Sequence, residues 1–157
     1  MMRARDRVAA TTPHVAGDGD IGEIQGIVGF HIRLAHGAVY RHFTESFAEL
    51  ELTQKQVSVL WLVGDHPDIA QTDLARRMRM DRATTMAVVN RLEAKRYLLR
   101  GKSASDARKQ TLNLTAPGRQ ALVAAQAAVR EHEKWLKARF SEAEVAQLIA
   151  LLTRIHE

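Results

Sequence analysis

Residues 71–115 read QTDLARRMRMDRATTMAVVNRLEAKRYLLRGKSASDARKQTLNLT, and the order of elements in this stretch decides the fold. The spacing of its apolar residues predicts a short helix over residues 72–78 and, after a tight connection, a second helix over residues 82–96 that Asp81 caps. A short helix, a tight turn and a second helix are typical of a helix-turn-helix unit, whose second helix enters the major groove of DNA.

Two short strands follow the second helix. Residues 97–100 and the alternating polar and apolar residues 110–114 have the pattern of half-buried strands, and the polar loop between them is too long for a tight turn. A hairpin in this position is a wing, which can contact phosphates or the minor groove while the helix lies in the major groove. The predicted fold class is therefore mainly α with a small β-hairpin wing, a winged helix-turn-helix.

Longer helices are predicted on both sides of this unit, and each has a capping residue at its start. Asp20, Thr53, Thr115 and Ser141 are the predicted caps, and three of them stand three residues before a Glu or Gln, as in a capping box. Residues 1–19 have no apolar periodicity and predict a flexible N-terminal arm. The predicted helices cover about residues 20–49, 53–64, 116–139 and 142–155.

Positive charge gathers in the middle of the chain. The net charge is +5, and residues 53–115 carry 12 Lys and Arg against 6 Asp and Glu, whereas residues 1–52 carry 5 against 7. A basic segment between nearly neutral flanks is typical of a protein that binds a polyanion, although a solvated basic face has the same composition.

The composition also excludes several classes of protein. Cysteine is absent, so we expect no disulfide framework, thiolate metal site or thiol redox sensor. No apolar run approaches the roughly 18 residues of a membrane span, and the basic N-terminal residues are not followed by the apolar core of a secretory signal. We therefore expect a cytoplasmic protein without a membrane partner.

The outward face of helix 82–96 carries candidate base-reading residues, because Thr85, Val88 and Leu92 have the spacing of its inward face. An arginine in the first turn can pair bidentately with guanine, and exposed apolar side chains suit thymine methyl groups. The alternative for Met86 and Ala87 is that they pack beneath the wing as ordinary core. The residues predicted to bind DNA here are Arg82, Thr84, Met86, Ala87, Asn90 and Arg91.

The wing supplies a second group of candidates. Cations on a loop of small residues suit a tip that enters a narrow minor groove, where the negative potential attracts arginine. A solvated turn would be the better interpretation of this loop alone, but its position behind a helix-turn-helix favours DNA contact. The residues predicted to bind DNA here are Lys102, Ser103, Asp106, Arg108 and Lys109.

The segment Asp106-Ala-Arg108-Lys-Gln-Thr-Leu112-Asn-Leu114-Thr115 resembles the D-x-R-x-x-x-L-x-L-T wing signature of the MarR family of bacterial regulators. Leu52-Thr53, Leu74-Ala75 and Arg91-Leu92-Glu93 are also similar to that family, and the resemblance covers about residues 20–157.

The resemblance implies an obligate homodimer with long N- and C-terminal dimerisation helices. The expected organisation is a dimerisation region of residues 20–52 and 116–157 around a DNA-binding lobe of residues 53–115. It also implies that Arg108 enters the minor groove, with Asp106 orienting Arg108 or an arginine of the recognition helix. Most members bind a pseudo-palindromic operator and repress, and many release DNA when a small aromatic or anionic ligand binds between the dimerisation helices and the DNA-binding lobe.

Three positions depart from the family pattern. Tyr97 stands where the family usually has glycine, which predicts a side chain at a position that favours left-handed backbone. Ala70 stands where a Ser or Thr cap is common, and Ala87 replaces a common polar base-reading residue. None of these changes threatens the fold, but Ala87 makes the operator sequence harder to infer.

A ligand site is predicted on the first long helix. Arg33, His36 and Tyr40 are spaced i, i+3 and i+7 and so share a face that could receive a carboxylate, phenolate or phosphate. Similar first-helix sequences in the family suggest sensors of phenolic acids or their CoA thioesters. A solvated surface with dimer contacts is the alternative for the same residues.

Other functions fit the sequence less well. His31 and His36 are five residues apart and do not align on a helix, so no metal site or other cofactor is expected. The chain has no G-x-S-x-G, H-E-x-x-H or glycine-rich phosphate loop, which argues against an enzyme. The main alternative is a non-specific architectural DNA-binding protein. A third reading is a protein-interaction module that has lost DNA binding, but it does not explain the cations of helix 82–96 and the wing.

Overall fold

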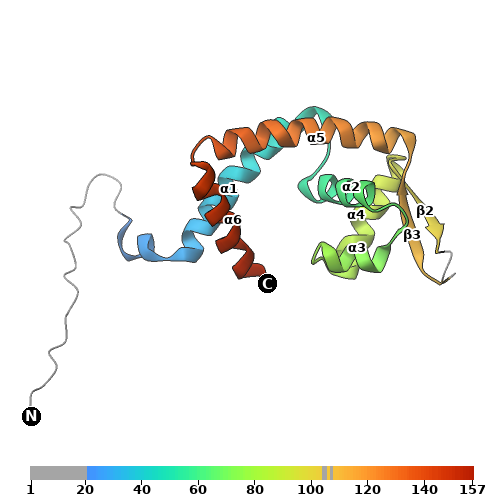
Figure 1. Ribbon diagram of the computed structural model, residues 1–157, viewed down its shortest axis with the longest axis horizontal. Helices are drawn as coiled ribbons and strands as arrows, with labels where there is room; N and C mark the ends of the chain where they lie inside the picture. Colours follow the sequence, from blue (N-terminus) through green and yellow to red (C-terminus); the bar gives the residue numbers. More distant parts are fainter. Residues whose placement is uncertain (1–20, 104–105, 107) are drawn as a thin grey trace, which may run out of the picture. The chain divides into compact units, whose positions relative to one another are not determined.

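The computed structural model describes residues 21–103, 106 and 108–157 and divides the chain into two compact units, residues 1–37 and 38–157. The predicted arm of residues 1–19 and the predicted cap Asp20 lie outside the described residues. In chain order the elements of Figure 1 are η1 (Gly22–Gly26), α1 (Val28–Ser46), η2 (Ala48–Leu50), α2 (Gln54–Asp65), β1 (Ile69–Ala70), α3 (Gln71–Arg77), α4 (Arg82–Ala94), β2 (Leu98–Lys102), β3 (Gln110–Leu114), α5 (Ala116–Lys137) and α6 (Glu142–His156).

The prediction of one long helix over residues 20–49 is wrong at both ends. Gly22–Gly26 form a 3₁₀ helix, and Ile27 has extended backbone with ψ 112° before α1 begins. Gly22 has φ +73°, a conformation that glycine adopts without steric cost and that interrupts a right-handed helix. At the other end α1 ends at Ser46, and the 3₁₀ helix η2 follows.

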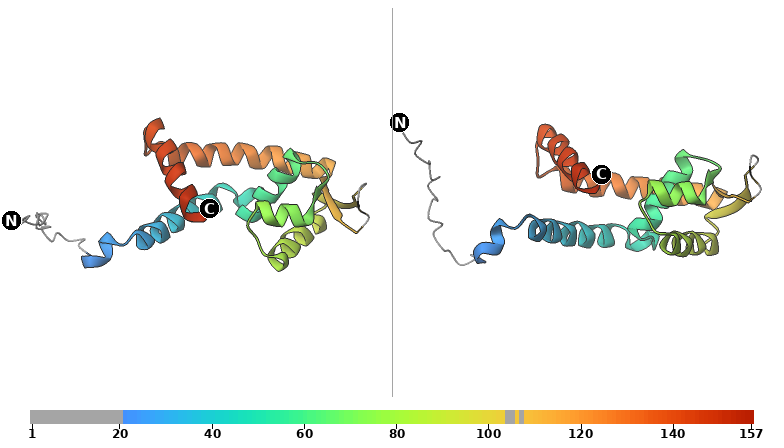
Figure 2. Two further views of the ribbon diagram at one scale, coloured as in Figure 1. Left: turned by 60° about the horizontal axis from the view of Figure 1, so that its bottom comes forward. Right: turned by 90° about the horizontal axis from the view of Figure 1, so that it is seen from below.

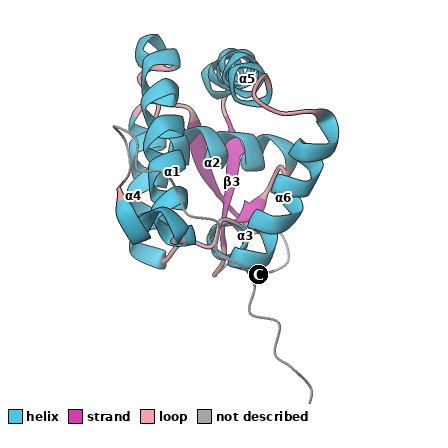
Figure 3. Ribbon diagram, turned by 90° about the vertical axis from the view of Figure 1, so that its left-hand side faces the viewer, coloured by secondary structure: helices cyan, strands magenta, loops and turns pink. Residues whose placement is uncertain are grey.

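The core of the second unit lies among α2, α3, α4 and the small sheet. The side chains predicted to face inward from the recognition helix, Thr85, Val88 and Leu92, are all buried. Leu60 of α2, Leu74 of α3 and Leu112 of β3 are fully buried in the same cluster. Figure 3 shows β3 beside α2, where the sheet closes one side of this core.

The sheet has three antiparallel strands in the order β1-β3-β2. β2 and β3 form the predicted hairpin, with Leu98 opposite Leu114 and Lys102 opposite Gln110. The short β1 joins the other edge of β3, where Ile69 pairs with Leu112. This third strand ties the start of α3 to the base of the wing, so the helix-turn-helix and the hairpin share one scaffold.

Both helices of the helix-turn-helix end in the same backbone motif. Arg79 after α3 and Arg96 after α4 have φ of 50° and 60°. After α4, the amide of Tyr97 donates to the Leu92 carbonyl and the amide of Arg96 to the Glu93 carbonyl, which is the hydrogen-bond pattern of a Schellman motif. The left-handed residue is therefore Arg96, and the expectation that Tyr97 occupies that conformation is wrong.

The two C-terminal helices begin at their predicted caps. Thr115 accepts a hydrogen bond from the Gly118 amide, and Pro117 lies in the first turn of α5, where no amide hydrogen is needed. Ser141 and Glu144 form a complete capping box at α6. Figure 2 shows that α6 leaves the far end of α5 at an angle instead of continuing it. No residue of α6 is buried, although the helix carries six large apolar side chains.

Candidate nucleic-acid interface

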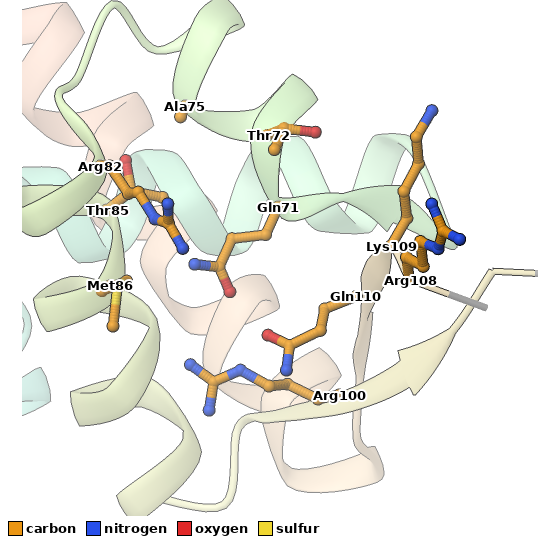
Figure 4. A pocket seen from close by; sticks show the side chains of 10 residues that line it. All are labelled: Gln71, Thr72, Ala75, Arg82, Thr85, Met86, Arg100, Arg108, Lys109 and Gln110. Atoms are coloured by element: carbon orange, nitrogen blue, oxygen red, sulfur yellow. The ribbon is translucent and has the colours of Figure 1, made fainter. Parts of the chain in front are cut away.

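An open cleft of about 630 Å³ lies between the start of the helix-turn-helix, the recognition helix α4 and the wing. Figure 4 shows Arg82 and Met86 from α4 on one side, Arg108 and Lys109 from the wing on the other, and Arg100 and Gln110 between them. None of the described residues that line the cleft is an Asp or Glu, so no side-chain carboxylate opposes its positive charge. The lining residues are Gln71, Thr72, Ala75, Arg82, Thr85, Met86, Arg100, Arg108, Lys109 and Gln110.

The N-terminus of α4 is held rigidly by its cap. The carboxylate of Asp81 accepts the Thr84 amide at 2.7 Å and the Thr84 hydroxyl at 2.6 Å. These two hydrogen bonds, the hydroxyl bond first, hold the pKa of Asp81 below its usual value. Arg82 follows this cap in the first helical turn and is exposed. Its guanidinium is therefore presented from a fixed backbone, as base recognition requires.

Met86 and Ala87 are both exposed, and 42% of the surface of Met86 is accessible. The alternative that they pack beneath the wing as buried core is therefore wrong. Met86 also lines the cleft, which places a flexible apolar side chain beside the cations there. This is the environment in which a thymine methyl group could be contacted.

The remaining candidates on α4 have different surroundings. Thr84 is half-buried, and its hydroxyl is engaged with the cap. Asn90 is exposed, and its side-chain oxygen accepts a hydrogen bond from Arg100. Arg91 is exposed in the last turn of α4. These three residues are not among those that line the cleft with Arg82 and Met86.

The wing turn is organised by Asp106. Its carboxylate accepts a hydrogen bond from the backbone amide of Arg108 at 3.0 Å, and its carbonyl accepts one from the amide of Lys109 at 2.9 Å. The Ser103 amide in turn donates to the Lys109 carbonyl. Asp106 thus acts on Arg108 through the backbone, and the exposed residues Arg108 and Lys109 line the wing side of the cleft. Lys102 is exposed at the end of β2.

Arg100 and the N-terminal residues of α3 lie at the cleft but are not among the residues predicted from the sequence. Arg100 of β2 contacts both Glu93 and Asn90 of α4, and Gln71 and Thr72 line the cleft. Two signals were available in the sequence. Arg100 ends the predicted strand two residues before Lys102, and the first turn of the first helix of a helix-turn-helix lies next to the recognition helix.

The predicted ligand residues all lie on α1 and are exposed. Arg33 and His36 belong to the first unit, where the Arg33 guanidinium lies 5.1 Å from the centroid of the Phe30 ring. Tyr40 belongs to the second unit and lines a groove of about 210 Å³ with Phe43, Phe47 and residues of the α2 N-terminus.

Across the described part of the chain, no group of three or more His, Cys, Asp or Glu side chains could hold a metal ion. In that same part, no helix is long and apolar enough to cross a membrane.

Comparison with known proteins gives the family. A model of the MarR family matches residues 50–109. A protein of Thauera aromatica assigned to the regulation of the hcr operon is 35% identical over 136 residues, which cover 86% of this chain and 82% of that protein. The chain belongs to the MarR family. The homoprotocatechuate degradative operon repressor of Escherichia coli is 27% identical over 75% of the chain and 80% of its own length.

Solved structures match about nine-tenths of this MarR chain as one fold. The transcriptional repressor CouR bound to a 23-mer DNA duplex matches with a TM-score of 0.83 and 29% identity, over 90% of this chain and all of that one. CouR bound to p-coumaroyl-CoA matches with a TM-score of 0.79 and 27% identity, over 89% and 99% of the two chains. The predicted winged helix-turn-helix of a MarR-type transcriptional regulator is thus confirmed, and these relatives are regulators and not enzymes.

Proposed function

We propose that this MarR protein is a cytoplasmic, sequence-specific repressor that binds a pseudo-palindromic double-stranded operator as a homodimer and is released by a small aromatic or anionic effector. The observation that carries the proposal is the cleft between α4 and the wing. It gathers Arg82, Arg100, Arg108 and Lys109 and contains no carboxylate among its lining residues. Such a surface attracts the phosphate backbone, and its concave form suits one face of a duplex.

The predicted DNA-binding residues contact different parts of the duplex: bases in the major groove, the minor groove and the phosphates. Arg82 is positioned to read a guanine in the major groove, and Met86 and Ala87 to contact thymine methyl groups. Arg108 enters the minor groove from the wing, and Asp106 fixes its backbone. The other predicted contacts, mainly to phosphates, are those of Thr84, Asn90, Arg91, Lys102, Ser103 and Lys109.

The homodimer is supported by apolar surface at both ends of the chain. In α6 every large apolar side chain but one is more than a third exposed, and the exposed fraction of Ile155 reaches 63%. The described part of the first unit also exposes Ile24, Ile27 and Val28. Soluble monomers rarely leave large apolar patches exposed, and a second copy would cover these side chains. The dimer would then hold its recognition helices about one DNA turn apart, roughly 34–36 Å.

The effector is proposed to be a phenolic acid or its CoA thioester. CouR has been solved with p-coumaroyl-CoA, and the Escherichia coli relative represses an operon that degrades an aromatic acid. Arg33, His36 and Tyr40 are the residues we assign to it, because a guanidinium, an imidazole and a phenol can bind a carboxylate or phosphate. A ligand that binds only dimers with another spacing of recognition helices would weaken operator binding by shifting the population.

The decisive experiment is a salt titration of binding that compares the chain's own upstream DNA with a scrambled duplex of equal length. We expect a preference of at least a hundredfold for its own DNA together with a steep salt dependence, as specific complexes show ratios of about 10³ or more. Equal binding to both duplexes would instead support the alternative, a non-specific architectural DNA-binding protein. Binding to neither duplex would argue against DNA recognition by this surface.

A further inference from the structure

A single arginine joins the wing to the recognition helix. Arg100, in the middle of β2, forms an ion pair through Nη1 with the carboxylate of Glu93 and donates through Nη2 to the side-chain oxygen of Asn90 at 2.6 Å. Only 24% of the Arg100 side chain is exposed, and its Nε is buried without a hydrogen-bond partner among the described residues. The guanidinium is therefore held by these two contacts with α4.

The chemistry of the guanidinium fixes the orientation of the Asn90 amide. An arginine has five N–H donors and no acceptor, so only the oxygen of the amide can face it. The Asn90 oxygen is thus turned toward Arg100, where one of its two lone pairs is used, and the amide nitrogen with its two donors is available to another partner. Glu93 holds the guanidinium from its other side, which keeps this arrangement fixed.

Asn90 lies on the same face of α4 as the base-reading candidates Arg82 and Met86. It is exposed on α4 and follows Arg82 and Met86 at intervals of four residues, so the three side chains share one face of the helix. The Arg100 side chain that holds it lines the same cleft as Arg82 and Met86. Asn90 therefore continues the row of base-reading candidates along α4 away from the helix N-terminus.

We propose that Arg100 is a positioning residue that orients Asn90 so that its amide nitrogen, a donor, faces the major groove. A free asparagine pairs bidentately with adenine, because its oxygen accepts from N6 and its nitrogen donates to N7. With the oxygen turned toward Arg100 and one of its two lone pairs used there, Asn90 is less suited to the bidentate pair with adenine, and its amide nitrogen favours the acceptor edge of guanine, which offers N7 and O6. This inference rests on the proposed function, since it concerns how the operator is read.

The test measures the affinity of the full-length dimer for a panel of operator duplexes in which each half-site base pair is replaced in turn. For Arg100→Met we expect one position per half-site to shift toward adenine by roughly fivefold or more, the lower end of what a bidentate contact contributes. The shift should vanish in the double variant Arg100→Met with Asn90→Ala. Lys102→Met is the matched control, because it removes the same charge from the same strand at an exposed position. It should weaken binding to all duplexes evenly.

Two outcomes for the Arg100 variants would contradict the proposed role of Arg100. A base profile of Arg100→Met that parallels the wild type, or an adenine shift that survives Asn90→Ala, would overturn the assignment. Asn90→Ala alone provides a test that does not depend on the folding of the Arg100 variant. We expect it to reduce a guanine preference at one position, whereas loss of an adenine preference, or no change at any position, would contradict the proposal. A wild-type protein that does not distinguish its operator from scrambled DNA would instead refute the proposed function.

Discussion

The side chains of His42 and His132 meet nitrogen to nitrogen, with their Nδ1 atoms 2.8 Å apart between α1 and α5. A hydrogen bond between two imidazoles needs one donor and one acceptor, so both rings cannot be protonated while it exists. His42 also stacks on Trp135 at a centroid distance of 3.9 Å, and His132 meets the edge of Phe43. The pair therefore joins the second half of α1 to α5 in a state that contains at most one positive charge.

This pair makes folding stability depend on pH. Burial and the neighbouring His42 lower the pKa of His132, and Glu133 opposes them only in part. Because the folded pKa lies below that of the unfolded chain, 6.5, the unfolded chain binds the proton first as the pH falls. We expect the thermal midpoint to be highest above pH 6.5 and to decrease as the pH falls toward the folded pKa.

Replacing the titrating ring tests this origin. His132→Phe should flatten the pH dependence of the thermal midpoint between pH 7 and 5, whereas His31→Gln, at an exposed histidine of α1, should leave it unchanged. Calorimetric melts across that range provide the measurement. An equally steep pH dependence in His132→Phe would show that another group titrates.

Arg108 should contribute to operator affinity without contributing to folding. Arg108 is exposed and lines the cleft, while the turn is held by the backbone contacts of Asp106. We expect Arg108→Ala to weaken operator binding at least about tenfold and to lower the salt slope by about 1, because one cation no longer contacts the DNA. The dimer should remain folded by light scattering and circular dichroism. Arg130→Ala on the exposed surface of α5 is the control, and unchanged operator affinity in Arg108→Ala would contradict the proposed role of the wing.

Arg33 should affect the response to the effector more than the affinity for DNA. Arg33→Ala removes the cation that we assign to the effector, and it leaves the DNA-binding cleft intact. We expect operator affinity within about twofold of the wild type and a clearly higher concentration of p-coumaroyl-CoA or an aromatic acid for release. The neighbouring Arg41→Ala, also exposed on α1, serves as the comparison. An effector response equal to that of the wild type would remove Arg33 from the site.

Gly118 should not tolerate any side chain. A Cβ at this position would lie 1.9 Å from the carbonyl oxygen of Tyr97, which is backbone and cannot move aside cheaply. We expect Gly118→Ala to lower the free energy of unfolding by about 1–3 kcal/mol or more, the cost of overpacking. Gly29→Ala is the matched control, since no atom lies within 4 Å of its added Cβ in α1. Denaturant unfolding of both variants measures the difference, and equal midpoints would show that the junction of Tyr97 and α5 relaxes.

The elements that could be predicted from sequence are those decided by neighbouring residues. Thr53 with Gln56 and Ser141 with Glu144 form the capping boxes that their spacing indicates. The alternation of residues 110–114 marks β3 over the same range. These features are readable because a cap or a strand face depends on side chains within a few positions of one another.

The sequence by itself therefore determined the order of helices, the winged helix-turn-helix and the row of cations that faces the cleft. Only the tertiary structure decided that Arg100 donates to the oxygen of Asn90, that His42 meets His132, and that Arg96 and not Tyr97 adopts left-handed backbone. The physical reason is distance along the chain. His42 and His132 stand 90 residues apart, and no local propensity specifies which of many polar side chains will be brought within hydrogen-bonding distance once the core has packed.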